Sequence, residues 1–164
     1  SLFESVSEEH ITSSMTVNAT AAMRIIHHFY PRINSSESFR TGVMVSIAGY
    51  LSSPFFAVYG ASKAALRYFI ESLNVELEKG GAVNRILNVS PGSIKGTSFG
   101  GGATDLAQTQ SLAEEIIAHL EAGDDLFIPQ YDEVFKNVLE RYHADFREEG
   151  RRSYDYKLKS GRVK

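Results

Sequence analysis

A tyrosine and a lysine four residues apart, in Tyr59-Gly-Ala-Ser-Lys63, are the pair of side chains with the clearest chemical potential. Residues i and i+4 of a helix share one face, so the lysine ammonium can lie close to the phenol. A phenol ordinarily titrates at about pH 10, and a fixed positive charge nearby favours the phenolate. This spacing therefore indicates a general acid–base that could work near neutral pH.

A serine and a polar segment are expected near this pair. Ser46 lies 13 residues before Tyr59, at the end of a predicted strand over residues 43–47. The ends of parallel strands are where an open α/β sheet holds its ligands. A hydroxyl there can donate to a substrate carbonyl and stabilise developing charge. The segment Asn88-Val-Ser-Pro-Gly92 ends a second predicted strand, at the same edge of the sheet.

Hydrophobic periodicity predicts the elements that would position these side chains. Helices are expected over residues 7–29, 57–79, 106–120 and 131–146, and strands over 43–47, 85–89 and 126–128. Pro31 is expected to end the first helix. Helices that alternate with strands in this way predict an α/β fold, with a parallel sheet of about three strands flanked by helices.

Composition excludes several classes of protein. The 164 residues are 43% hydrophobic and 23% charged, a globular balance, and the net charge of −3 offers no overall basic field for nucleic acid. Cysteine is absent, which excludes a disulfide framework and fits a reducing compartment. The histidines show no ligand spacing, so no metal site is predicted. No apolar run approaches the roughly 18 residues of a membrane span, and we expect a cytoplasmic protein without a membrane or nucleic-acid partner.

The end of the chain differs in charge from the rest. Residues 151–164 form a basic tail with a formal charge of +5, after a body of residues 1–150. One interpretation is an arm that docks on an anionic partner. The other is a solvated extension that packs Tyr154 and Tyr156 on the body or on a neighbouring subunit.

Ser46, Tyr59-Gly-Ala-Ser-Lys63 and Pro91-Gly92, in this order and spacing, resemble the motifs of the short-chain dehydrogenase/reductase family. Asn18, in Thr16-Val-Asn-Ala-Thr20, matches the asparagine that this family places before the serine. The resemblance covers about residues 5–130. It implies that the sheet is part of a doubly wound, Rossmann-like sheet, and that residues 1–150 are the C-terminal catalytic part of a dinucleotide-binding domain.

The resemblance also implies a function and a role for each residue. The protein would be an NAD(P)-dependent oxidoreductase that moves a hydride between nicotinamide and a carbonyl or alcohol substrate, with Tyr59 as general acid–base. Ser46 would orient the substrate, Lys63 would stabilise the phenolate and hold the nicotinamide ribose, and Asn18 would hold a water in a proton relay. The expected contacts to the nicotinamide end of the cofactor are completed by Pro91, Gly92, Ile94 and Thr97.

The sequence departs from the family pattern in two places. Gly96 stands where the family commonly has a threonine, and Thr97 follows it. The glycine-rich phosphate turn of the family is absent, and Gly100-Gly-Gly102, a flexible loop by composition, does not lie between a strand and a helix. The sequence therefore leaves open whether the cofactor is NAD or NADP. We expect a fragment that by itself neither binds dinucleotide tightly nor turns over.

Family members commonly pair two helices across a two-fold axis, which implies a homo-oligomer formed through the helices over 7–29 and 57–79. Two other functions stay open. One is a catalytically inactive relative that binds a dinucleotide or a partner. The other is a serine hydrolase, in which Gly60-Ala-Ser-Lys-Ala64 would form a nucleophile elbow with Asp124 and His143. The substrate pocket would be lined by Tyr50, Phe55, Phe56 and Phe99 unless these aromatic residues belong to the core, and the loop over 97–110 could cover it as a lid.

Overall fold

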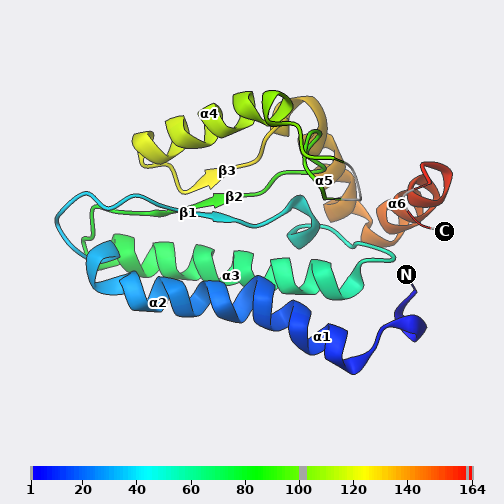
Figure 1. The fold of residues 1–164 in the computed structure, drawn as a ribbon, viewed down its shortest axis with the longest axis horizontal. Helices are drawn as coiled ribbons and strands as arrows, with labels where there is room; N and C mark the ends of the chain where they lie inside the picture. Colours follow the sequence, from blue (N-terminus) through cyan, green and yellow to red (C-terminus); the bar gives the residue numbers. More distant parts are fainter. Residues whose placement is uncertain (1, 100–102, 162, 164) are drawn as a thin grey trace.

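The computed structural model describes residues 2–99, 103–161 and 163, so the predicted Gly100–Gly102 loop lies outside the described residues. Three parallel strands form one sheet in the order β1 (Thr41–Met44), β2 (Ile86–Val89) and β3 (Leu126–Phe127). Helices α1 (Glu8–Met15), α2 (Ala21–Ile33) and α3 (Ala57–Lys79) lie on one side of the sheet, and α4 (Leu106–Ala122) lies on the other (Figure 1). The parallel α/β architecture predicted from the sequence is confirmed.

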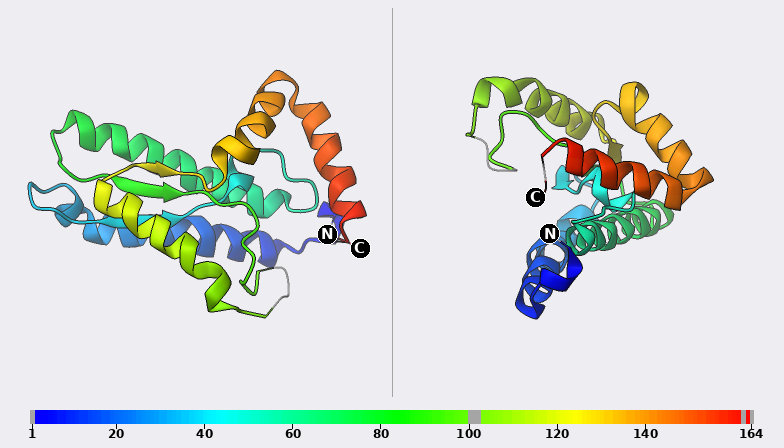
Figure 2. Two further views of the ribbon diagram at one scale, coloured as in Figure 1. Left: turned by 90° about the horizontal axis from the view of Figure 1, so that it is seen from above. Right: turned by 90° about the vertical axis from the view of Figure 1, so that its right-hand side faces the viewer.

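The core lies between the sheet and the helices α2 and α3. Its buried members are aliphatic side chains. Those on α2 and α3 recur at helical spacing, and the others lie in the strand segments: Ile26, Ile33, Leu66, Ile70 and Leu77 on the helices, and Val45 and Ile86 in the strand segments. Burial of one such side chain stabilises the folded state by about 1.5–3 kcal/mol. This packing holds the C-terminal ends of the strands next to the first turns of α3, as the view from above shows (Figure 2).

The first predicted helix, over residues 7–29, differs from the expectation in two ways. It contains a π-helical turn at Thr16–Thr20 between α1 and α2, and it continues through Pro31 to Ile33. The prediction that Pro31 ends the helix is wrong, because a proline in the last turn removes only one backbone hydrogen bond. Burial of Ile33, which is 0% exposed, and a bond from the amide of Asn84 to its carbonyl stabilise the extra residues.

The predicted strand over residues 43–47 is also displaced. β1 ends at Met44, so Ser46 lies beyond the strand and begins the 3₁₀ turn η3 (Ile47–Gly49). The other two strands and the helix over 57–79 agree with the prediction. α4 agrees as well, and ends two residues later than expected, at Ala122, before a left-handed Gly123.

The last predicted helix, over residues 131–146, is in fact three elements. A π-helical turn (Tyr131–Phe135) leads into α5 (Lys136–Ala144), and α6 (Phe146–Lys159) follows after a single extended residue, Asp145. The carboxylate of Asp145 accepts hydrogen bonds from the backbone N–H groups of Arg147 and Glu148, and so begins a new helix.

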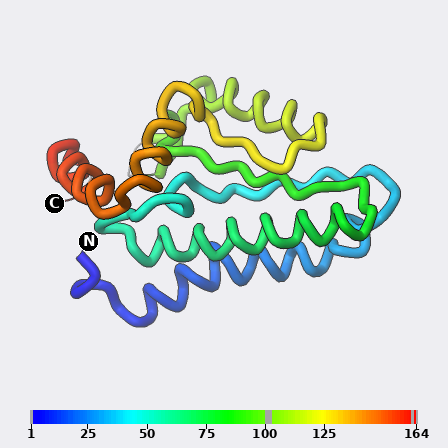
Figure 3. Tube along the Cα trace, turned by 180° about the vertical axis from the view of Figure 1, so that it is seen from behind, coloured from blue at the N-terminus to red at the C-terminus, as the bar shows by residue number. Residues whose placement is uncertain are grey.

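The beginning of the basic tail is therefore helical, because α6 extends to Lys159. Its Tyr154 ring stacks on Phe55, with centroids 4.5 Å apart, as the packing interpretation of the tail expects. Seen from behind, α6 lies beyond the C-terminal edge of the sheet, near the start of α3 (Figure 3). Within the described part of the chain, no helix is both long enough and apolar enough to cross a membrane.

Candidate active site

Two segments that follow neighbouring strands run side by side at the C-terminal edge of the sheet. Beyond the end of β1, the N–H of Val45 donates to the carbonyl of Val89 at 2.8 Å, and the N–H of Ile47 donates to the carbonyl of Pro91 at 3.0 Å. These bonds continue the parallel pairing past the strands. They hold Ser46 beside the Ser90-Pro91 segment, as the sequence predicted for this edge.

Ser46 is nearly buried, with 8% of its surface exposed. Its hydroxyl oxygen accepts a hydrogen bond from the N–H of Ala48 at 3.1 Å, which makes it the N-cap of η3. Because the oxygen acts as acceptor in this bond, the hydroxyl proton can be donated to another acceptor, such as a carbonyl oxygen.

Close contact with α3 places η3, and Ser46 with it, against the Lys63 turn. A Cβ atom on Gly49 would lie 2.9 Å from both the carbonyl carbon and the carbonyl oxygen of Lys63. Only a glycine allows the two backbones to approach so closely. The serine segment and the tyrosine–lysine helix are therefore in direct contact.

Lys63 extends from α3 to the end of β1. Its Nζ donates a hydrogen bond to the carbonyl oxygen of Met44 at 2.9 Å. The side chain is half-buried, and this burial lowers the pKa of Lys63 from its ordinary value. An ammonium carries three N–H donors, so it can bind a ligand hydroxyl in addition to Met44.

Tyr59 lies one turn before Lys63, and the two side chains meet as the spacing predicted. The Nζ of Lys63 is 5.9 Å from the centroid of the Tyr59 ring. The Tyr59 ring also contacts Phe99, whose ring centroid is 5.9 Å away at an angle of 42°. The Tyr59 ring therefore has a cation and an aromatic ring each 5.9 Å from its centroid.

Asn18 contacts α3, the helix that carries Tyr59 and Lys63, through Ser62, a residue to which the sequence did not assign this role. Asn18 lies in the π-helical turn Thr16–Thr20, where its amide Nδ2 donates to the hydroxyl of Ser62 at 3.1 Å. Ser62 is fully buried, and its hydroxyl donates to the backbone carbonyl of Tyr59 at 2.7 Å. π-helical turns are uncommon and occur frequently at functional sites. The structure brings Asn18 to the residue next to Lys63.

The residues predicted to contact the nicotinamide follow β2. Pro91 is buried, and a Cβ atom on Gly92 would lie 2.6 Å from the Phe135 ring, so the missing side chain makes room for that ring. Further along, the hydroxyl of Thr97 donates to the carbonyl of Ile94 at 2.9 Å. The bond between Thr97 and Ile94 thus stabilises one local turn. Pro91 lies at the C-terminal edge of the sheet, beside η3.

A polar network that the sequence did not reveal ties η3 to β2. The hydroxyl of Ser90 donates to Oδ1 of Asn88 at 2.6 Å, and Nδ2 of Asn88 donates to the phenol oxygen of Tyr50 at 2.9 Å. Burial raises the pKa of Tyr50 above its ordinary value. Asn88 is 1% exposed, and a buried amide of this kind requires partners. The sequence signal for it was an asparagine within an otherwise apolar strand.

Of the four aromatic residues considered for the substrate pocket, Phe99 is the one that contacts the Tyr59 ring. Tyr50 belongs to the network with Asn88, Phe55 stacks on Tyr154, and Phe56 lies below the Lys157 ammonium. The sequence left open whether these four residues line a pocket or belong to the core, and Phe99 is the one of them that lies against the proposed proton-transfer residue.

The arrangement contradicts the serine hydrolase alternative. A nucleophile elbow requires an exposed serine between a strand and a helix, whereas Ser62 is fully buried inside α3. Asp124 pairs with His119 at 2.6 Å, and the ring of His143 packs edge-on against Tyr142.

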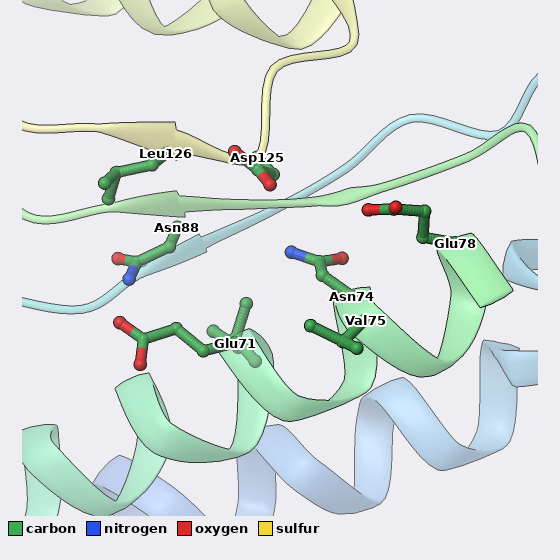
Figure 4. Close-up of a pocket in the computed structure, with 8 residues that line it drawn as sticks. Glu71, Asn74, Val75, Glu78, Asn88, Asp125 and Leu126 are labelled. Atoms are coloured by element: carbon green, nitrogen blue, oxygen red, sulfur yellow. The ribbon is translucent and has the colours of Figure 1, made fainter.

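A groove of about 250 Å³ lies at a different place, between α3 and the β2–β3 edge (Figure 4). Its lining residues are Ile70, Glu71, Asn74, Val75, Glu78, Asn88, Asp125 and Leu126. The amide of Asn74 donates to the carbonyl of Ile86 at 2.9 Å and accepts from its N–H at 2.8 Å. This side chain therefore completes the backbone bonding of β2, and its role in the groove is structural.

Comparison with known proteins gives concordant matches. A family model described as short chain dehydrogenase matches residues 1–106. The uncharacterized oxidoreductase TDA5 of Saccharomyces cerevisiae is 28% identical over 128 residues, which cover 74% of this chain and 39% of that protein. The 17-beta-hydroxysteroid dehydrogenase type 1 of Homo sapiens is 36% identical over 74 residues, which cover 45% of this chain and 23% of that protein.

Solved structures show the same fold. A short chain dehydrogenase from Burkholderia cenocepacia in complex with NADP superposes with a TM-score of 0.72 at 22% identity, over 92% of this chain and 62% of that one. A short chain dehydrogenase/reductase from Burkholderia phymatum in complex with NAD superposes with a TM-score of 0.72 at 16% identity, over 88% of this chain and 61% of that one. The chain spans less than half the length of the two curated relatives that it matches.

Proposed function

Since the chain belongs to the short-chain dehydrogenase family, we propose that it carries the proton-transfer residues of an NAD(P)-dependent oxidoreductase acting on a carbonyl or alcohol. One observation carries the proposal. The Lys63 ammonium lies at the end of β1, 5.9 Å from the centroid of the Tyr59 ring, and Gly49 of η3, the turn that Ser46 caps, packs against the backbone of Lys63.

The roles of the side chains follow from their hydrogen-bonding capacity. In the direction of reduction, Tyr59 gives its proton to the carbonyl oxygen, and in oxidation it takes the proton of the hydroxyl. Ser46 donates its hydroxyl proton to the same oxygen and stabilises the charge that develops on it. Lys63 places its ammonium group beside the Tyr59 ring, 5.9 Å from the ring centroid. Asn18, through Ser62, fixes the backbone of Tyr59.

The described residues fit the nicotinamide end of the cofactor. Lys63 has N–H donors for ribose hydroxyls besides the one that it gives to Met44. Pro91, Gly92, Ile94 and Thr97 follow β2 along the chain and would bind the carboxamide side, and Pro91 lies at the same edge, where its carbonyl accepts from Ile47. When bound, the nicotinamide supplies or accepts the hydride. The choice between NAD and NADP stays open, since relatives of this fold bind one or the other.

The test is a pair of tyrosine variants in the complete gene product. Loss of NADH or NADPH absorbance is followed with a panel of ketones and aldehydes. Tyr59→Phe should lower turnover by about 100-fold or more, because the proton donor is removed. Tyr68→Phe is the matched control, since Tyr68 lies on the same helix and is 70% exposed. If Tyr59→Phe keeps full turnover, the proposal fails. If the unaltered protein reduces no carbonyl but still binds the dinucleotide, the inactive relative takes its place.

A further inference from the structure

We propose that Tyr154 and Lys157 of α6 are positioning residues for Tyr59, because they clamp the turn from which α3 begins. The turn consists of residues 53–56, and we call its contacts with Tyr154 and Lys157 the C-terminal clamp. The proposal rests on the function proposed above, in which Tyr59 transfers the proton.

Lys157 binds the turn directly. Its Nζ donates to the carbonyl oxygen of Pro54 at 2.9 Å and to the hydroxyl of Ser53 at 3.2 Å. It also lies 5.3 Å from the centroid of the Phe56 ring. One ammonium group therefore contacts three of the four residues of the turn, across a sequence separation of more than 100 residues.

The conformation of this turn is unfavourable without support. The N–H of Phe56 donates to the carbonyl of Ser53 at 2.9 Å, Pro54 occupies the second position, and Phe55 in the third position has φ +69°. This is the pattern of a type II turn, whose third position favours glycine. A phenylalanine there is strained, and the stacking of its ring on Tyr154, at 4.5 Å and 28°, compensates for the strain.

The turn is in contact with the residue next to Tyr59. A Cβ atom on Gly60 would lie 3.3 Å from Cβ of Ser53, so the two backbones are closely packed. The N–H of Gly60 donates to the carbonyl of Phe56 at 2.8 Å, which is the first hydrogen bond of α3. A shift of the turn would therefore change the start of the helix and the direction of the Tyr59 side chain.

The clamp is itself held by α5. Arg141 forms two hydrogen bonds to the carboxylate of Glu149, at 2.8 and 3.1 Å, and Glu149 is 9% exposed. Asp145 caps the N-terminus of α6. The views from the front and from behind place α6 beyond the C-terminal edge of the sheet, near the start of α3 (Figures 1 and 3). α6 is therefore anchored at its beginning and contacts the turn through its second half.

The first experiment measures hydrogen exchange of the backbone amides of Phe56 and Gly60 in the 164-residue chain. Lys157→Met and Tyr154→Leu should each accelerate this exchange by about tenfold or more, because the bonds of the turn open more often. Lys159→Met, which removes the same charge at an exposed site of the same helix, should not. Lys157→Arg keeps a cationic donor and should restore slow exchange. Equal rates in all variants would overturn the proposal.

The second experiment measures turnover in the complete gene product. Lys157→Met should lower kcat by about tenfold or more, since a misplaced catalytic group is costly. The KM for the dinucleotide should not change, and Lys157→Arg should restore kcat. If Tyr59→Phe abolishes turnover but Lys157→Met leaves kcat unchanged, the positioning role fails and the proposed function stands. If Tyr59→Phe has no effect while Lys157→Met accelerates exchange, the proposed function fails and the clamp on the turn stands.

Discussion

Lys63 donates a hydrogen bond from α3 to the carbonyl oxygen of Met44, at a distance of 2.9 Å, and so ties the proposed catalytic helix to the end of β1. The same burial that permits this bond lowers the pKa of the ammonium. Because of this bond and this lowered pKa, we expect the titration of Lys63 to change the free energy of unfolding.

The first prediction concerns the pH dependence of stability. Because the folded-state pKa of Lys63 is lowered, the unfolded chain binds more protons between that value and the ordinary value of 10.5. Stability should therefore rise with pH across this window. Urea unfolding of the native chain and of Lys63→Met, at several pH values below 10.5, measures the effect. The free energy of unfolding of the unaltered chain should rise relative to that of Lys63→Met as the pH rises. A difference between the two free energies that stays constant with pH would contradict the prediction.

The second prediction concerns the bond between Asn18 and Ser62. Ser62 is fully buried, so removal of either partner leaves a polar group without its hydrogen bond. In a double-mutant cycle with Asn18→Ala and Ser62→Ala, we expect a coupling free energy of about 1 kcal/mol. Ser72→Ala on the same helix is the control and should not couple to Asn18. A coupling near zero would show that the bond does not stabilise the fold.

The third prediction concerns the close approach of η3 and α3. In Gly49→Ala, the added Cβ would lie 2.9 Å from backbone atoms of Lys63, which cannot rotate away. We expect a loss of about 3 kcal/mol in the free energy of unfolding, measured by urea denaturation. In Gly81→Ala the new Cβ would meet nothing within 4 Å, and its φ of +79° should cost only about 1 kcal/mol. Equal losses for the two variants would contradict the steric argument.

The fourth prediction concerns binding of the dinucleotide by these 164 residues alone. They hold the residues proposed for the nicotinamide end but no glycine-rich phosphate turn, which supplies much of the binding in such folds. Calorimetric titration with NAD and with NADP should show no tight binding and the chain should not turn over. A dissociation constant of about 1 μM, or about −8 kcal/mol of binding free energy, would prove this expectation wrong.

The fifth prediction concerns self-association through the helices predicted over 7–29 and 57–79. In the structure these helices expose large apolar side chains, among them Ile25 at 60% and Val75 at 58%. We expect native mass spectrometry of the complete gene product to show an oligomer, and Ile25→Glu to shift it toward monomer. Leu106→Glu, on the other side of the sheet and 77% exposed, is the control. A native protein that is only monomeric would contradict the proposal.

The sequence by itself was sufficient for the order of the elements and for the Tyr59–Lys63 pair. Hydrophobic periodicity is a local property, and two residues four apart on a helix meet whatever surrounds the helix. The apolar run over residues 43–47 is also a local signal, and it placed Ser46 at the correct edge of the sheet. The strand itself ends earlier, at Met44.

Only the tertiary structure decided the rest. The π-helical turn around Asn18 and the extra residues of α2 after Pro31 have partners elsewhere in the chain, which periodicity does not report. The break at Asp145 is a local cap on Arg147 and Glu148, which hydrophobic periodicity does not report either. The contact of Lys157 with Ser53 joins residues 104 apart. Contacts of that kind arise when the packed sheet and helices bring distant segments together, because the large apolar area that they bury outweighs local preference.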